Sequence, residues 1–150
     1  MRKNRIGTQG TAILLSVKSQ RGVSVEEKIR SHQDLIAEEG AVYWGIGFPI
    51  VEKRFRFPLK AYVCMVGKGE VHYSATIDGV EVYTEPQRPK HEELCPWYYA
   101  KFPPYRTYFI VSELKEMSKP MKVTGFKRYP SGEPAKGCPQ GYTVVNDPFF

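Results

Sequence analysis

Near its start the chain has a helix with clear signals at both ends, between two apolar segments. Ser24 is followed three residues later by Glu27, the spacing of a capping box at a helix start. Gly40 stands where a residue in the left-handed conformation commonly ends a helix. Residues 11–17 and 41–46 are short apolar runs typical of buried strands. The first third of the chain is therefore predicted to fold as strand, helix, strand.

The later segments indicate further strands. Residues 61–66 and 71–77 flank a glycine-bearing turn and predict a β-hairpin. Three more strands are expected at residues 107–111, 121–126 and 141–145. About six strands with one early helix predict an α+β protein built on a small, curved, mostly antiparallel sheet or open β-barrel.

Length and composition favour one folding unit. The chain has 150 residues, of which 41% are hydrophobic, and this is enough apolar material for a single core. We expect one domain over residues 11–150. Residues 1–10 are basic and polar, with Arg2, Lys3 and Arg5, and are expected to form a loose N-terminal arm.

The charge balance favours an acidic partner. Twenty-two Lys and Arg residues against 16 Asp and Glu residues give a formal charge of +6, which suits a polyanion such as nucleic acid or a membrane surface, although a merely basic protein has the same balance. No run approaches the roughly 20 apolar residues of a membrane span, and no secretory signal is evident. A cytoplasmic protein that does not enter the membrane is expected.

The cysteines give no sign of a shared structural role. Cys64, Cys95 and Cys138 are odd in number and far apart, and no Cys-x-x-Cys pair occurs. Neither a disulfide framework nor a zinc site is predicted, and all three are expected to be buried or incidental thiols. No cofactor is predicted either.

Two segments carry the residues best suited to bind a flat ring. The first is the polar turn Lys18-Ser19-Gln20 after the first strand, together with Trp44 at the end of the second. The second is the proline-rich loop at residues 85–104, whose aromatic residues indicate that it is ordered against another part of the protein. A tryptophan beside a polar turn can form one wall of a pocket, while the turn contacts the edge of the ring.

The order strand, Lys-Ser turn, helix, then Val-x-Trp resembles the opening of YTH domains and their EVE relatives, which belong to the PUA-like superfamily and bind modified bases. The resemblance implies a PUA-like open barrel in which the turn contacts the modified nucleoside. It implies base contacts from Lys18, Ser19, Gln20, Tyr43, Trp44 and Gly45. The family has asparagine where this chain has Gln20, so an amide is kept.

The later part of the chain is similar to the family more loosely. The family draws a second cage tryptophan from a long loop, which corresponds to Trp97, with Tyr98 and Tyr99 as substitutes. Its closing basic, glycine-bearing turn resembles residues 127–132, so phosphate contacts are expected from Lys127 and Arg128. Lys53, Arg54 and Arg56 form either a further phosphate track or a solvated loop.

The resemblance implies a domain that flips a modified base into an aromatic cage and is not itself an enzyme. N6-methyladenine is the favoured base and 5-methylcytosine the second, with DNA preferred and methylated RNA as the alternative. Similar domains are the specificity modules of McrB-type modification-dependent restriction systems, where a GTPase motor and a nuclease are fused to or associated with them.

Other functions stay open at this point. Trp44 could fill the core, and the aromatic loop could cover an open barrel edge or dock a protein partner. ASCH relatives in the same superfamily include amidohydrolases that use a Lys, a Thr and a Glu, and Lys18, Thr76 and Glu70 are of these types. His32 lies on the inner face of the predicted helix and is expected to be a packed, hydrogen-bonded residue.

Overall fold

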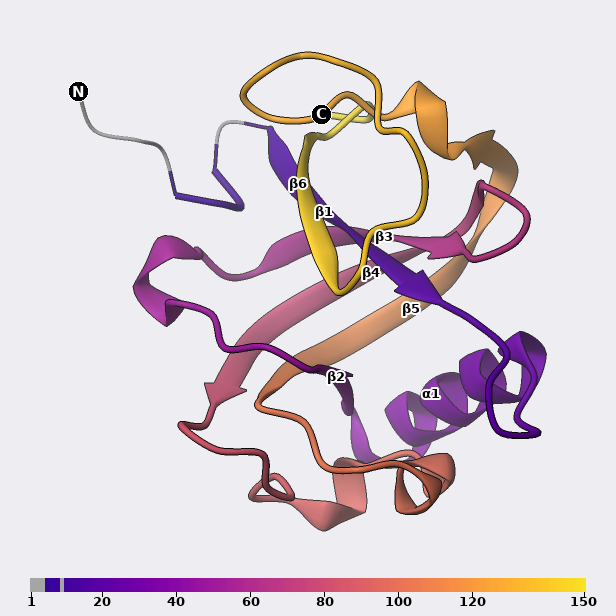
Figure 1. Ribbon diagram of the computed structural model, residues 1–150, viewed down its shortest axis with the longest axis vertical. Helices are drawn as coiled ribbons and strands as arrows, with labels where there is room; N and C mark the ends of the chain where they lie inside the picture. Colours follow the sequence, from indigo (N-terminus) through magenta and orange to yellow (C-terminus); the bar gives the residue numbers. More distant parts are fainter. Residues whose placement is uncertain (1–4, 9) are drawn as a thin grey trace.

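A six-stranded β-sheet and one α-helix make up most of the regular structure in the computed structural model, which describes residues 5–8 and 10–150 (Figure 1). In chain order the strands are β1 (Thr11–Val17), β2 (Val42–Ile46), β3 (Leu59–Met65), β4 (Glu70–Val82), β5 (Thr107–Lys122) and β6 (Tyr142–Asn146). The helix α1 (Val25–Glu39) connects β1 to β2. The predicted α+β class is confirmed.

The strand order across the sheet is β2-β5-β4-β3-β1-β6, and the sheet curls into a half-barrel (Figure 1). Neighbouring strands are antiparallel except β1 and β3, which are parallel. A parallel pair needs a crossover connection, and α1 and β2 lie within it. The prediction of a curved, mostly antiparallel sheet is confirmed at this level.

The two longest strands give the sheet its curvature. β4 has 13 residues and β5 has 16, and their pairing shifts register at three places. Such bulges bend a strand and increase its twist. The prediction of a separate strand at residues 121–126 is wrong, because β5 ends at Lys122 and a short 3-10 turn follows at Val123–Gly125. This turn buries Val123 and Phe126, three residues apart, on the same side.

Strand β1 is buried on both faces, which explains its unbroken apolar sequence. Ile13 and Leu15 pack into the same cluster as Val25 and Ile29 of α1. Leu14, on the opposite face, belongs to a second cluster, which includes Tyr62, Phe126 and Val145. A strand that is covered on both sides needs no alternating polar residues.

The ends of α1 follow the local signals. The Ser24 side chain accepts a hydrogen bond from the Glu27 amide at 3.1 Å, and the Glu27 carboxylate accepts one from the Ser24 amide at 3.2 Å. Gly40 has φ 85°, and its N–H donates to the Ile36 carbonyl. The predicted capping box and left-handed cap are both confirmed.

The N-terminal arm is only partly described. Arg2 and Lys3 lie outside the described residues, so the expectation of a loose arm is not addressed there. Ile6 forms a parallel bridge with Phe55 and is buried in the main core cluster. The described part of the arm around Ile6 is therefore attached to the domain rather than loose.

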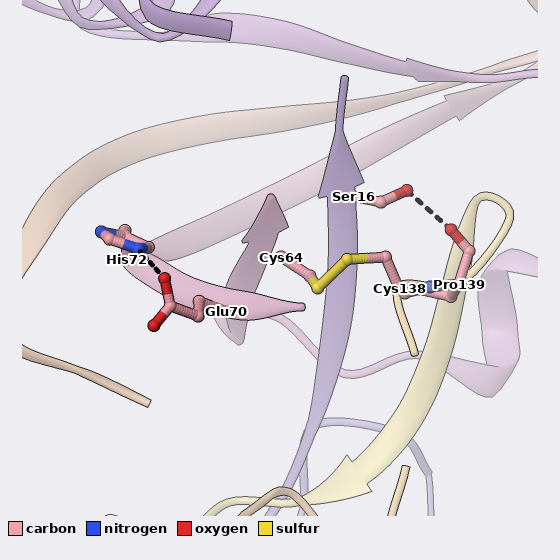
Figure 2. The surroundings of a disulfide bond; sticks show 6 residues. All are labelled: Ser16, Cys64, Glu70, His72, Cys138 and Pro139. Carbon is pink, nitrogen blue, oxygen red and sulfur yellow. Dashed lines mark hydrogen bonds and ion pairs between the residues drawn. A yellow bond between two sulfur atoms is a disulfide. The ribbon is translucent and has the colours of Figure 1, made fainter. Parts of the chain in front are cut away.

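The expectation for the cysteines is corrected, because Cys64 of β3 and Cys138 form a disulfide across 74 residues of sequence (Figure 2). Their Cα atoms are 5.6 Å apart, within the usual range for this bond. Cys95 is a free thiol. Disulfides are uncommon in the cytosol except in hyperthermophilic organisms.

Within residues 5–8 and 10–150, no helix is both long and apolar enough to cross a membrane.

Candidate functional site

A cavity of about 500 Å³ opens where the turn after β1, strand β2, the loop before β5 and the loop before β6 meet. This volume lies in the range typical of small-molecule binding sites. Its lining residues are Ser16, Val17, Lys18, Gln20, Lys28, Trp44, Gly45, Val66, Tyr98, Tyr99, Tyr105, Cys138, Pro139, Gln140 and Gly141. The turn and the tryptophan that were expected to act together are thus brought to one cavity.

The polar turn supplies two of its three predicted side chains to the cavity. Lys18 and Gln20 are exposed and line it. The turn is closed by two hydrogen bonds between the backbones of Gln20 and Val23, each of 2.9 Å. Ser19 is not part of the lining; its hydroxyl oxygen accepts from the Val25 amide at 3.2 Å, at the start of α1. Ser19 therefore helps to fix the turn against the helix.

Strand β2 separates its two adjacent aromatic residues. Trp44 is 6% exposed, lines the cavity and contacts the His32 ring at a centroid distance of 4.7 Å. Tyr43 is fully buried in another cluster, where its hydroxyl donates to the Glu81 carboxylate. Successive side chains of a strand point to opposite faces, so Tyr43 does not reach the cavity.

Gly45, which follows Trp44, allows the loop before β5 to approach the strand closely. Its N–H donates to the Tyr99 hydroxyl at 2.8 Å, and that hydroxyl donates to the Tyr43 carbonyl at 3.2 Å. A Cβ atom at Gly45 would collide with the Tyr105 ring. The absence of a side chain at Gly45 thus permits the wall formed by Tyr99 and Tyr105.

The aromatic loop contributes tyrosines to the cavity, whereas its tryptophan lies elsewhere. Tyr98 and Tyr99 are buried and line the cavity. Trp97 is 53% exposed and lines a different hollow, on the outer face of α1, together with Glu27, Arg30, Ser31, Asp34, Leu35, Glu38 and Cys95. The Trp97 and Tyr98 rings are nearly perpendicular, at 85°. Tyr98, rather than Trp97, therefore lines the cavity together with Trp44.

His32 fixes the relation between Trp44 and the aromatic loop. Its Nε2 atom lies 2.7 Å from the Tyr98 hydroxyl, and its ring packs against Trp44. Burial, assisted by the positive charge of Lys28, lowers the pKa of His32 to about 3, so the ring is neutral at ordinary pH. The expectation of a packed, hydrogen-bonded histidine is confirmed.

One wall of the cavity comes from the chain before β6. Pro139, Gln140 and Gly141 form it, and two long-range links hold it in place (Figure 2). The first is the disulfide between Cys138 and Cys64 of β3. The second is a 2.7 Å hydrogen bond from the Ser16 hydroxyl of β1 to the Pro139 carbonyl. Sequence reasoning missed this wall, because only the fold brings these distant residues together.

The cavity is positively charged. Lys18 and Lys28 both line it, and among the described residues no lining residue is acidic. Burial, with the positive charge of Lys18 as a second cause, lowers the pKa of Lys28. Lys28 was not predicted as a site residue, although it lies four residues before His32 on α1 and thus on the same helix face.

The basic residues expected to bind phosphates are not gathered in one place on the surface. Lys53 and Arg54 line a hollow of about 470 Å³ with Arg5, Ile6, Tyr129, Pro130 and Val144. Arg128 lines another hollow, of about 400 Å³, with Lys136 and the Cys138–Pro139 segment of the cavity wall. Lys127 and Arg56 are exposed and lie outside both linings.

The residue types of the amidohydrolase alternative do not meet in the cavity. Glu70 begins β4, close to His72, to which its carboxylate lies at 3.2 Å (Figure 2). Thr76 lies six residues further along the same strand, a separation of roughly 20 Å at about 3.3 Å per residue. Of the three residues, Lys18 alone lines the cavity.

Comparisons with protein-family models, with curated proteins and with solved structures find no match to this chain.

Proposed function

We propose that this domain is a PUA-like module of the YTH and EVE type that binds nucleic acid carrying a modified base. The base is flipped out of its strand and enters the cavity beside Trp44. N6-methyladenine is the favoured base, with 5-methylcytosine second, and DNA is the preferred nucleic acid over RNA. As in similar domains of McrB-type restriction systems, the module would deliver a GTPase motor and a nuclease to modified DNA.

The observation that carries this proposal is the convergence of three distant segments on one cavity. The turn supplies Lys18 and Gln20, strand β2 supplies Trp44, and the aromatic loop supplies Tyr98 and Tyr99. Aromatic walls provide stacking surfaces and area for apolar contact, while the lysine and the amide supply hydrogen-bond donors for the edge of a ring. This combination suits a planar heterocycle better than an aliphatic ligand.

The cost of flipping a base out of a duplex is similar in size to the gain from stacking it on aromatic side chains. Removing a base from a duplex costs a few kcal/mol, and stacking on aromatic side chains returns about 1–3 kcal/mol per base. A buried methyl group adds on the order of 0.8 kcal/mol. The methyl group alone therefore gives roughly fourfold discrimination, and a close aromatic fit around it raises this toward the tenfold to hundredfold range.

Phosphate contacts supply the remaining affinity. Beside the cavity wall, the Gly141 backbone lies against the Phe48 ring, and Phe48 stacks on Tyr142 at a centroid distance of 5.8 Å. Burial raises the pKa of Tyr142, and the positive charge of Arg54 opposes this rise. A strand that leaves the cavity beside Gly141 would reach Arg54 along this surface.

The two tryptophans give a matched test of the proposal. Fluorescence polarisation with methylated and unmethylated oligonucleotides, in single- and double-stranded DNA and RNA, should show tighter binding to one modified base. Trp44→Phe and Lys18→Ala should reduce this preference. Trp97→Ala should leave it unchanged, because Trp97 lies outside the cavity. Lys18 is exposed, so its variant tests the cavity without disturbing the core.

Two results would contradict the proposal. One is equal affinity for modified and unmodified oligonucleotides in the wild-type protein. The other is a preference that is lost in Trp97→Ala and kept in Trp44→Phe, which would move the base-binding site to the outer face of α1. Raising the salt concentration should weaken all binding, since phosphate contacts release counterions.

A further inference from the structure

The cavity is lined by a largely buried lysine that has no carboxylate partner. Lys28 of α1 is 7% exposed and lines the cavity. Its Nζ atom lies 5.3 Å from the centre of the Tyr98 ring and 5.1 Å from that of the Phe102 ring. In the described parts of the chain, no Asp or Glu lies within ion-pair distance of Lys28. The ammonium group therefore faces two aromatic rings in place of a carboxylate.

A charge in this position is unusual for a residue with only a structural role. Buried charges in proteins are normally paired, because removing an ammonium group from water is costly. The two ring faces offset part of this cost through cation–π attraction. Lys18 adds a second positive charge to the same lining, and the repulsion between the two charges further disfavours the protonated form of Lys28. A ligand with a negative charge would compensate both ammonium groups.

We propose that Lys28 and Lys18 form an anion subsite inside the cavity, which takes the phosphate group of the same nucleotide whose base lies beside Trp44. This inference rests on the proposed function and deepens it. It assigns the cavity to a whole nucleotide rather than to a base alone. Phosphate oxygens accept several hydrogen bonds at once, and a lysine ammonium has three donors.

The position of Lys28 on the helix fits this assignment. Lys28 precedes His32 by four residues, so the two side chains lie about one helical turn apart on the same face. The His32 ring in turn contacts Trp44. A nucleotide carries its phosphate one sugar away from its base, so a base at Trp44 places the phosphate within reach of this turn of the helix.

The test compares ligands with and without the phosphate. Calorimetric titrations would use N6-methyl-2′-deoxyadenosine, its 5′- and 3′-monophosphates, the corresponding unmethylated nucleotides and inorganic phosphate. One of the two methylated monophosphates should bind the wild-type protein about tenfold or more tightly than the nucleoside, as expected for charge-assisted hydrogen bonds. Lys28→Met, which keeps the length and apolar contacts of the side chain, should abolish most of this difference, while Lys28→Arg, which keeps the positive charge, should retain part of it.

The matched control is Lys60→Met. Lys60 lies on β3 and lines a different hollow with Tyr62 and Met117, so its variant should keep the full preference for the monophosphate. Lys18→Met should reduce the preference in part. Urea unfolding of each variant would show that the fold is intact. The comparison of nucleoside with monophosphate in the wild-type protein needs no variant at all.

The outcomes separate this inference from the proposed function. Equal binding of the nucleoside and both monophosphates overturns the anion subsite, and a methyl preference would still support the base cavity. A monophosphate preference that depends on Lys28 but not on the methyl group supports the subsite and contradicts modified-base recognition. Binding of none of these probes, inorganic phosphate included, overturns the subsite.

Discussion

Acidification should destabilise the protein through His32. Its pKa lies near 3 in the folded protein, against 6.5 for an unperturbed histidine. Between these values the unfolded chain binds a proton that the folded protein does not. The free energy of unfolding therefore rises with pH, by up to about 1.4 kcal/mol per pH unit. The stabilising contribution is fully present above about pH 6.5 and is lost as the pH falls toward about 3.

The structure supports both the sign and the size of this effect. His32 is 1% exposed, packs against Trp44 and pairs with the Tyr98 hydroxyl, so its ring has no access to water in the folded state. Over the two pH units from about 6.5 to about 4.5, the expected loss is about 2 kcal/mol, because the unfolded histidine is only half protonated at the upper pH. This is a large part of the 5–15 kcal/mol that stabilises a typical domain.

Urea unfolding followed by circular dichroism at several pH values would measure it. The stability difference between the wild-type protein and His32→Gln should shrink by about 2 kcal/mol over this range, because the variant has no group to titrate at this position. His91→Gln is the matched control, since the His91 side chain is 56% exposed. A difference that stays constant with pH for His32→Gln would refute the reasoning.

Three further variants test contacts that are expected to stabilise the fold. Removing the disulfide with Cys138→Ser and Cys64→Ser together should lower the free energy of unfolding by about 2–4 kcal/mol in urea titrations, and an unchanged value would contradict its stabilising role. Gly45→Ala should cost about 1–3 kcal/mol because the new methyl group meets the Tyr105 ring; an unaffected melting temperature would show that the ring moves freely. Ser24→Ala removes the capping box and should cost about 1 kcal/mol, measured by thermal unfolding, and a neutral result would rule out that contribution.

The elements set by local chemistry could be predicted from the sequence. The start and end of α1 follow from Ser24, Glu27 and Gly40, because capping depends on residues three or four positions apart. The resemblance also predicted that residues of the polar turn and Trp44 line one site. Strand alternation further separates Trp44 from Tyr43, a consequence that the sequence analysis did not draw.

The rest depends on contacts between distant segments. Nothing local distinguishes Trp97 from Tyr98, because the direction of each depends on how a short 3-10 turn docks on α1. The pairing of Cys138 with Cys64 and the wall at Gly141 arise only when β6 lies beside β1. Lys28 could have been found, since helical periodicity places it on the inner face, but a lysine there is easily taken for a surface residue.

The central claim is that a modified base lies beside Trp44, and a nuclear Overhauser measurement tests it most directly. The ligand would be an oligonucleotide with one N6-methyladenine whose methyl group is isotope-labelled, bound to the wild-type protein. The account predicts contacts between the methyl protons and the ring protons of Trp44 or of Tyr98 and Tyr99, which line the same cavity. Contacts with Trp97 alone, or with none of these rings in a fully bound complex, would contradict it.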